Sequence, residues 1–423
     1  MCKKILSFLL VGICLIATLT PIRALENSED IGLTCDYAVA IDAKSGLVLY
    51  NKNMDERMYP ASMTKVMTVI LALELMDDMK KTTVITQSDI DTVWETGASS
   101  ANFEVGETVT YEDLLYGAIL PSGADATRAL ANNLCGSQEA FVDKMNELAQ
   151  KLNLKDTHFV NTTGIHDENH YTTVHDMALI VQYAIQNEDF KNIYAQRYKT
   201  SSNGLHQWVN KSMYNAKRAK INVDDILGCK SGYTNEAKSC LSSLNRVNDN
   251  EIITIVGHSV NNDVKTHAAV SDTLDIMNYV GQHYSLQSIL TKGAKVRTLD
   301  VTLAKDEQKI AITNLNDVSA FLPNDFNKDD LEYKYSFKKL EAPVKKGEKV
   351  GDLKVYYQDK LLYQEEYATT KEIEKDTFSY ILGVVKDFMF PYGLAIILVI
   401  IYILILRMKK RREIKFLCST MCL

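Results

Sequence analysis

Ser62 and Lys65 have the spacing in this sequence that is best suited to chemistry. They lie at the start of an apolar stretch that runs to Met76. This stretch is apolar almost all round, which predicts a helix buried on every side. A serine and a lysine three positions apart lie on one helix face, so the lysine can serve as the base that a hydroxyl nucleophile needs. Burial lowers the pKa of a lysine toward the range where it accepts a proton.

The spacing alone has ordinary alternatives. Ser62 could be a helix N-cap. Ser336 and Lys339 repeat the spacing, but in an alternating stretch typical of a β-strand, where residues three apart face opposite ways. Nucleophilic catalysis at Ser62 therefore needs further residues.

A second group lies at Lys230, Ser231 and Gly232, on a predicted strand over residues 226–233. A lysine there can bind a substrate carboxylate, a hydroxyl can assist, and a glycine lets a substrate backbone approach. Lys44-Ser-Gly46 has the same pattern, but it precedes Ser62 and lies between two β-rich runs. We interpret that copy as a hairpin turn.

Ser122 is the third candidate, in Pro121-Ser-Gly123 between predicted helices over residues 111–120 and 125–134. A hydroxyl projected from such a break could relay a proton to a leaving group. Ser100-Ala-Asn102 is a competing serine-to-asparagine pair. We prefer Ser122 because the helix break holds it rigidly, although either serine could be a simple cap.

The order of elements predicts an α/β sandwich. A hairpin over residues 37–50 is followed by a helical middle, then by strand patterns up to residue 257 and a helical pattern over 266–279. Both ends of this domain would complete one sheet. Residues 292–367 contain short alternating runs separated by Gly, Asn and Asp, which predict a small all-β domain. The predicted boundaries are 25–285 for the first domain and 286–378 for the second.

Both ends of the chain indicate a membrane. Residues 1–24 combine early lysines with an apolar core and are typical of a secretory signal peptide. Residues 388–406 are apolar and about long enough to span a bilayer. The basic residues of 407–423 follow directly, which predicts a cytoplasmic tail and a first domain outside the cytoplasm.

The charge of the predicted outer part is acidic. Without the signal peptide and tail, 38 basic and 53 acidic residues remain, a formal charge of −15. A nucleic-acid partner would need clustered cations, so we exclude one. Four cysteines, Cys35, Cys135, Cys229 and Cys240, would lie in an oxidising space. A bridge between Cys229 and Cys240 is left open.

These motifs together resemble the low-molecular-mass penicillin-binding proteins that act as D-alanyl-D-alanine carboxypeptidases. The resemblance runs from about Tyr37 to Lys375. It includes Tyr59-Pro-Ala-Ser-Met-Thr-Lys65, Leu114-Leu-Tyr-Gly117, Pro121-Ser-Gly123, Asn161-Thr-Thr-Gly164, His170-Tyr-Thr-Thr173, Gly228-Cys-Lys-Ser-Gly-Tyr-Thr234 and Val344-Lys-Lys-Gly347. It implies the transpeptidase-type sandwich that penicillin-binding proteins share with β-lactamases.

The resemblance also implies a mechanism. Ser62 would attack the D-Ala-D-Ala bond of peptidoglycan stem peptides to form an acyl-enzyme, with Lys65 as proton acceptor and Ser122 as proton shuttle. Lys230, with Ser231 and Gly232, would bind the terminal part of the substrate. Penicillins and other β-lactams would acylate Ser62, because their strained amide mimics the dipeptide.

Two positions depart from the family pattern. Ser231 replaces the usual threonine and keeps the hydroxyl. Ala124 stands where the family usually has an asparagine that orients the lysine and the substrate. The second departure leaves a weakly active or inactive penicillin-binding protein as an alternative.

Other functions have less support in the sequence. His158, His166, His170 and His175 are close in sequence, but their spacing matches no metal motif, so we expect no metal and no other cofactor. A β-lactamase would need a carboxylate to activate water, and Glu168 is the candidate in the right region. A binding protein without activity would explain Ala124, but not the presence of Ser62, Lys65 and Lys230 together.

Overall fold

The computed structural model describes residues 27–260, 267–304, 308–386 and 390–420. The predicted signal peptide lies outside these residues. The chain forms two compact units. The first contains the described residues up to Ser285 together with Phe321–Asp325, and the second contains Leu286–Ala320 and the described residues from Phe326 onward.

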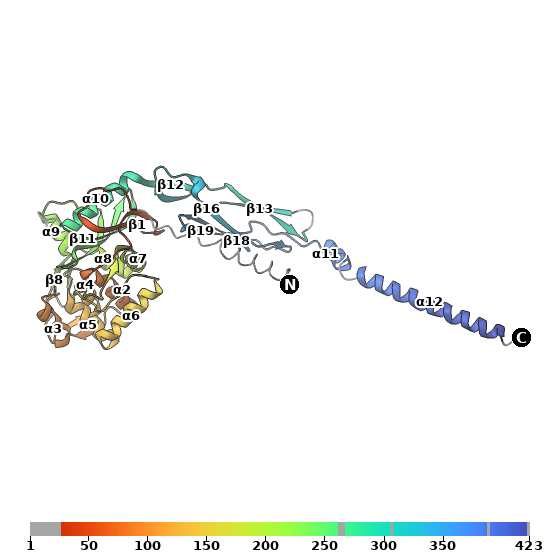
Figure 1. The fold of residues 1–423 in the computed structure, drawn as a ribbon, viewed down its shortest axis with the longest axis horizontal. Helices are drawn as coiled ribbons and strands as arrows, with labels where there is room; N and C mark the ends of the chain where they lie inside the picture. Colours follow the sequence, from red (N-terminus) through yellow and green to blue (C-terminus); the bar gives the residue numbers. More distant parts are fainter. Residues whose placement is uncertain (1–26, 261–266, 305–307, 387–389, 421–423) are drawn as a thin grey trace, which may run out of the picture. The chain divides into compact units, whose positions relative to one another are not determined.

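The first unit is built on an antiparallel sheet of five strands in the order β2-β1-β11-β10-β9 (Figure 1). Strands from both ends of the unit are therefore neighbours, as predicted. Their bounds are β1 Cys35–Asp42, β2 Val48–Lys52, β9 Ile226–Thr234, β10 Lys238–Val247 and β11 Asn250–Ser259. The predicted α/β sandwich is confirmed.

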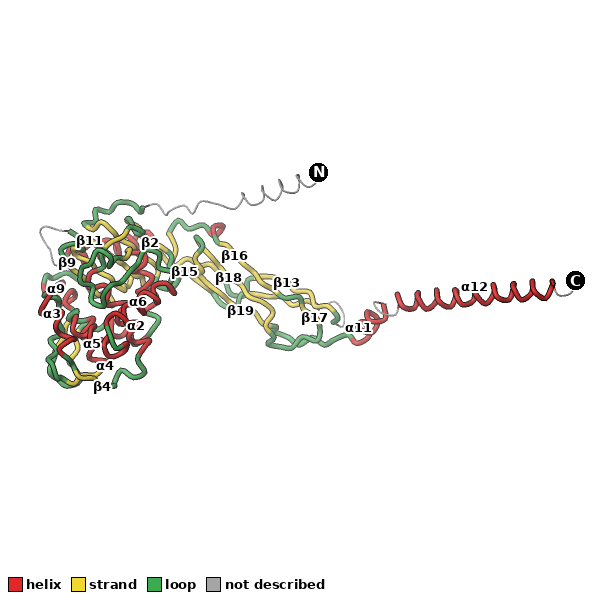
Figure 2. The backbone as a smooth tube through the Cα atoms, turned by 60° about the horizontal axis from the view of Figure 1, so that its bottom comes forward, coloured by secondary structure: helices red, strands yellow, loops and turns green. Residues whose placement is uncertain are grey.

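Helices cover the sheet and form a lobe of their own (Figure 2). Helix α10 packs on β10 and β11, α7 packs on β1 and β11, and α8 packs on β9. The bounds are α2 Lys65–Leu75, α3 Gln87–Thr96, α4 Tyr111–Ile119, α5 Ala124–Cys135, α6 Gln138–Lys151, α7 Val174–Ala184, α8 Glu188–Ala195, α9 Lys211–Arg218 and α10 Ala268–His283.

Short strand pairs connect these elements. They are β3 Arg57–Met58 with β6 Thr172–Thr173, β4 Thr82–Val84 with β5 Thr108–Thr110, and β7 Tyr198–Thr200 with β8 Gln207–Val209. Side-chain caps define several helix starts. At α4, Thr110 Oγ1 accepts from the backbone N–H of Asp113, whose carboxylate accepts from the Thr110 backbone in return.

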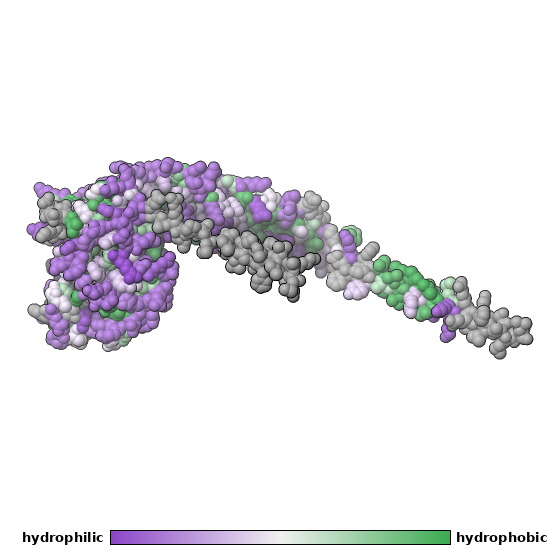
Figure 3. Space-filling view, in the orientation of Figure 1, coloured by the Kyte–Doolittle hydropathy of each residue, from purple (hydrophilic) through white to green (hydrophobic). Residues whose placement is uncertain are grey.

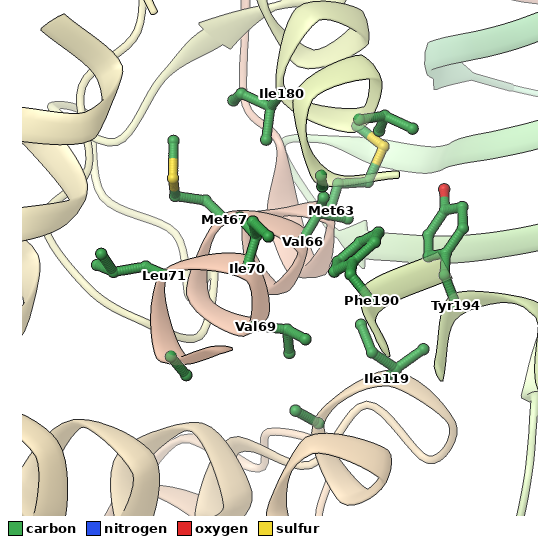
Figure 4. Close-up of a cluster of buried hydrophobic side chains, with 14 of the residues drawn as sticks. Met63, Val66, Met67, Val69, Ile70, Leu71, Ile119, Ile180, Phe190 and Tyr194 are labelled. Carbon is green, nitrogen blue, oxygen red and sulfur yellow. The ribbon is translucent and has the colours of Figure 1, made fainter. Parts of the chain in front are cut away.

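Helix α2 is the centre of the helical lobe. It contacts α4, α5, α6, α7 and α8, and its residues from Lys65 to Ala72 are buried. Figure 4 shows its side chains pointing in several directions, toward residues such as Ile119, Ile180 and Phe190. Each apolar side chain buried in this way contributes about 1.5–3 kcal/mol. The predicted all-round burial of this segment is confirmed.

The start of this helix differs from the prediction. Residues Ala61–Thr64 form one turn of 3-10 helix, η1, and the α-helix begins only at Lys65. Ala61 has a positive φ of 46°, and Thr64 Oγ1 donates to the carbonyl of Ala61 at 2.8 Å. This local turn satisfies the backbone before α2 begins, so Ser62 lies in a tighter turn than a continuous helix would give.

The second unit is all-β up to residue 368, as predicted. It contains a sheet in the order β14-β13-β17 and a sheet in the order β16-β18-β19. The bounds are β13 Lys295–Thr302, β14 Gln308–Thr313, β16 Glu332–Phe337, β17 Leu340–Glu341, β18 Lys349–Tyr357 and β19 Lys360–Ala368. Strands β12 Tyr284–Leu290 and β15 Val318–Pro323 pair with each other, and η2 spans Lys328–Asp330.

Two helices follow the β strands. They are α11 Thr377–Val384 and α12 Phe390–Thr420. Among the described residues, one helix is long and apolar enough to cross a membrane, and the apolar span runs over Tyr392–Lys410. Figure 3 shows its exposed apolar side chains as a continuous band.

Candidate active site

Ser62 and Lys65 are in direct contact. Lys65 Nζ lies 2.9 Å from Ser62 Oγ and donates to the backbone carbonyl of Thr163 at 2.6 Å. Lys65 is only 2% exposed. Burial lowers its pKa well below the usual value, and the charge of Lys230 lowers that pKa further, although Asp125 opposes the shift. A lysine in this setting can be a neutral amine, which is able to accept a proton from the hydroxyl.

The carbonyl of Thr163 is held toward Lys65 by a local turn. The side-chain oxygen of Asn161 accepts from the backbone N–H groups of Thr163 and Gly164, at 3.1 and 2.7 Å. The neighbouring carbonyl of Thr162 accepts from Thr68 on α2 at 2.8 Å. This loop therefore holds the amine of Lys65 in place beside Ser62.

Ser122 and Lys230 form a second hydroxyl–lysine pair. Lys230 Nζ donates to Ser122 Oγ at 2.9 Å and to the carbonyl of Ser231 at 2.7 Å. Ser122 lies between α4 and α5 with a positive φ of 67°, which the break between the helices imposes. Burial lowers the pKa of Lys230 to about 7, with a smaller opposing effect from Cys229. Near neutral pH this amine therefore exchanges its proton readily.

Glycines bring three backbone segments together around Ser62. A Cβ added at Gly232 on β9 would lie 2.9 Å from the backbone N of Ser62. A Cβ at Gly164 would lie 1.8 Å from the carbonyl oxygen of Ala61, and Gly164 also has a positive φ of 80°. Only glycine fits at such distances from backbone atoms.

The candidate residues line one cavity of about 370 Å³. Its walls include Ser62, Ser122, Lys230, Ser231 and Gly232. Lys65 lies behind Ser62 and does not line the cavity. Residues more than 160 positions apart in the chain thus meet at one opening, at the junction of η1, the α4–α5 break and β9.

The competing serine motifs do not join this cluster. Ser100 Oγ donates to the buried carboxylate of Asp125 at 2.6 Å and serves to hold its loop. Ser45 Oγ donates to Asp42 at 2.8 Å in the turn between β1 and β2. This confirms that Lys44-Ser-Gly46 forms a hairpin turn. Ser336 lies on β16 of the second unit.

The histidines have structural partners. His170 is buried, its Nε2 lies 2.8 Å from Thr64 Oγ1, and its Nδ1 accepts from the backbone of Val160. Burial lowers the pKa of His170 to about 4, so it is neutral. No group of three His, Cys, Asp or Glu residues able to hold a metal occurs within the described ranges.

Three further observations concern alternatives that the sequence leaves open: the cysteines, Glu168 and Ala124. Within the described part of the first unit the four cysteines are free, and the β9–β10 register sets Cys240 opposite Gly232 rather than opposite Cys229. Glu168 lines a different cavity from Ser62. Ala124 is fully buried as the first residue of α5, and its backbone N–H donates to the carbonyl of Ser99.

Sequence reasoning gave no role to two residues at the site. One is Thr163, whose backbone carbonyl receives Lys65 and so carries no side-chain signal. The other is Lys211, an exposed residue at the start of α9 that lines the cavity. Burial lowers the pKa of Lys211, opposed by Asp125. Only the fold brings this third amine near the other two.

Comparison with known proteins identifies the family. Residues 24–260 match the D-alanyl-D-alanine carboxypeptidase family, and residues 284–375 match the penicillin-binding protein 5 C-terminal domain. The chain belongs to the D-alanyl-D-alanine carboxypeptidase family. It is 30% identical over 388 residues to D-alanyl-D-alanine carboxypeptidase DacF of Bacillus subtilis, covering 89% of this chain and 96% of that protein.

Other members of the family are similar over most of their length. D-alanyl-D-alanine carboxypeptidase DacA of Escherichia coli is 29% identical and covers 80% of this chain, with 84% of its own length matched. Penicillin-binding protein 5 from Haemophilus influenzae has a TM-score of 0.63 at 23% identity, covering 83% of this chain and 100% of that chain, and supports the fold. The Streptomyces K15 DD-transpeptidase has a TM-score of 0.54 at 28% identity, covering 60% and 98%.

The contact at Gly164 leads to a prediction about Ser62. Gly164→Ala is expected to slow acylation of Ser62 by a fluorescent penicillin about 10²-fold, because the new methyl displaces the turn that carries the serine. Gly136→Ala is the matched control. Gly136 has the same φ of 80°, but nothing lies within 4 Å of an added Cβ, so this variant should keep its acylation rate. Equal rates in the two variants would contradict the role of the contact.

Proposed function

We propose that this family member is a serine-type carboxypeptidase that removes the terminal D-alanine from peptidoglycan stem peptides ending in D-Ala-D-Ala. One observation carries the assignment of roles. Two hydroxyl–lysine pairs, Ser62 with Lys65 and Ser122 with Lys230, lie at one cavity with the same 2.9 Å separation. One pair is suited to attack on the carbonyl, and the other to binding and protonating the leaving group.

The first half of the reaction forms an acyl-enzyme. Lys65 accepts the proton of Ser62, and Oγ attacks the carbonyl carbon of the penultimate D-alanine. The backbone N–H of Ser62, at the start of the η1 turn, is suited to stabilise the developing oxyanion. As the C–N bond breaks, a proton passes through Ser122 to the amine of the leaving D-alanine, while protonated Lys230 binds the terminal carboxylate.

The second half restores the enzyme. Water attacks the ester carbonyl, Lys65 accepts a proton from it, and the C–O bond to Ser62 breaks with return of the proton to Oγ. A β-lactam would follow the first half only in part, because its amine remains tethered to the acyl group. Penicillins are therefore expected to leave Ser62 acylated.

We also propose where this reaction takes place. The apolar span at Tyr392–Lys410 supports anchoring of the chain in a membrane by α12. Its basic flank supports a cytoplasmic C-terminal end, with the first unit in the cell envelope outside the cytoplasm. The N-terminal sequence supports export as a signal peptide. This location would hold the enzyme near the peptidoglycan and give it a part in cell-wall synthesis and cell shape.

The test of the proposal is release of D-alanine. Full-length protein in detergent micelles is expected to release D-alanine from a peptide ending in D-Ala-D-Ala, and Ser62→Ala is expected to lower the rate by about 10⁴-fold or more. Ser336→Ala, which removes the other serine of the same spacing, should keep full activity. Release of D-alanine that persists in Ser62→Ala would refute the assignment of Ser62 as the nucleophile. Peptide binding without release by the unmodified protein would identify a binding protein instead.

The two lysines predict a bell-shaped pH profile. The value of kcat/KM should rise with pH as Lys65 loses its proton, because only the neutral amine is a base. It should fall above about pH 7, where Lys230 in the free enzyme loses the charge that binds the carboxylate. Lys230→Arg should move the alkaline limb beyond the range of measurement, since a guanidinium keeps its proton. An unchanged alkaline limb in that variant would assign the limb to another group.

A weakly active enzyme is the second candidate, and Ala124 favours it. Its methyl group can make no hydrogen bond to Lys65 or to the substrate. Ala124→Asn is expected to raise the rate of D-alanine release about tenfold if the amide reaches these groups. Thermal unfolding of the same variant distinguishes a catalytic effect from loss of packing. A lower rate with unchanged unfolding temperature would show that this chain works best with alanine.

A further inference from the structure

A second cavity lies beside the active site in the first unit. It measures about 530 Å³, within the range of small-molecule sites. Tyr59, three residues before Ser62, forms part of its wall. Glu236 and Ala237, in the turn between β9 and β10, form another part. The wall of this cavity is therefore formed in part by chain segments that are directly continuous with those that carry Ser62 and Lys230.

The residues of strand β9 indicate in which direction a bound substrate would run through the active site. Lys230 lies at the end where the leaving D-alanine would bind, and Gly232, two residues further on, lies against Ser62. The acyl part of the substrate must then continue past Gly232, toward the β9–β10 turn. Glu236 lies only four residues beyond Gly232, which is at most about 14 Å of extended chain. The second cavity is therefore on the acyl side of the bond to be cleaved.

The charges of this cavity are unbalanced. Its two basic residues are already paired, Arg57 with Asp156 at 2.7 Å and His258 with Asp36. Its two glutamates, Glu168 and Glu236, are exposed and have no hydrogen bond or ion pair among the described residues. Two unpaired carboxylates in the wall of a cavity favour a positively charged ligand.

The tyrosines in the wall of the cavity also suit a positively charged ligand. Tyr37, Tyr59 and Tyr171 line the cavity. The ring of Tyr171 is already occupied, since the guanidinium of Arg57 lies 4.2 Å from its centre, so Tyr37 and Tyr59 are the tyrosines that remain for a ligand. Aromatic faces attract ammonium groups, and they also pack against an alkyl chain. The cavity can thus receive an alkyl arm with a charged end.

We propose that this cavity binds the side-chain ammonium of the substrate residue that precedes D-Ala-D-Ala. Glu168 and Glu236 bind the charge, and Tyr37 and Tyr59 contact the alkyl chain. The inference rests on the proposed carboxypeptidase function and extends it to the choice of substrate. A diamino acid at this position is then recognised, whereas the same residue with an acylated amine loses both contacts to the glutamates.

The experiment compares two peptides with the full-length protein in detergent micelles. They are Nα-acetyl-L-lysyl-D-Ala-D-Ala and its Nα,Nε-diacetyl counterpart. The kcat/KM for D-alanine release is expected to be about tenfold or more higher for the free amine, the ratio that a 1.4 kcal/mol preference produces. In the double variant Glu168→Gln, Glu236→Gln the ratio should fall close to one, through loss on the amine peptide alone. Glu147→Gln, an exposed glutamate on α6, is the matched control and should keep the ratio.

A second readout separates this proposal from the proposed function. Each peptide is added as a competitor of fluorescent penicillin at Ser62, which reports binding without turnover. Better competition by the amine peptide that disappears in the double variant supports the cavity, even if no D-alanine is released. Equal competition by both peptides, or an amine preference that survives in the double variant, overturns it. Absence of release from both peptides would instead refute the carboxypeptidase function.

Discussion

The burial of two amines, Lys65 and Lys230, in one site is the constraint on which the rest of the site depends. Both lysines are 2% exposed, and the charge of one lowers the pKa of the other. An ammonium group is costly in a poorly solvated region, and a second positive charge nearby adds to that cost, so the neutral form of Lys65 is favoured. Burial lowers the pKa of Lys65 well below its usual value, which favours a neutral amine beside Ser62, and it lowers the pKa of Lys230 to about 7, where this amine can still carry a charge. A base and an anion-binding group can thus coexist at one pH.

The rest of the first unit keeps these groups in place. Helix α2 is surrounded by five other helices, so Lys65 enters the site from the most rigid part of the lobe. Strand β9 belongs to the five-stranded sheet and presents Lys230 and Gly232 from the other side. Glycine at 232 and at 164 removes the side chains that would hold these segments apart. Packing therefore supplies the short distances that the chemistry needs.

Strand β9 is also electrostatically asymmetric. Its Lys230 end, with Lys211 nearby, is cationic and faces the terminal carboxylate of the proposed substrate. Beyond its other end, Glu168 and Glu236 are unpaired acids at the neighbouring cavity. A peptide with an anionic end and a cationic side chain would be oriented by both, which fixes its direction over Ser62.

The sequence by itself determined the class of fold, since strand and helix periodicity depend on local side-chain spacing. The hairpin over residues 37–50, the buried helix at α2 and the change to β strands after residue 292 were all predicted correctly. It also indicated Ser62, Lys65, Ser122 and Lys230, because their spacing within short motifs carries a signal. The tertiary structure alone decided that these motifs share one cavity and that Cys229 and Cys240 remain apart. It alone revealed the carbonyl of Thr163, the amine of Lys211 and the acidic cavity, because contacts between distant segments depend on packing and leave no local pattern.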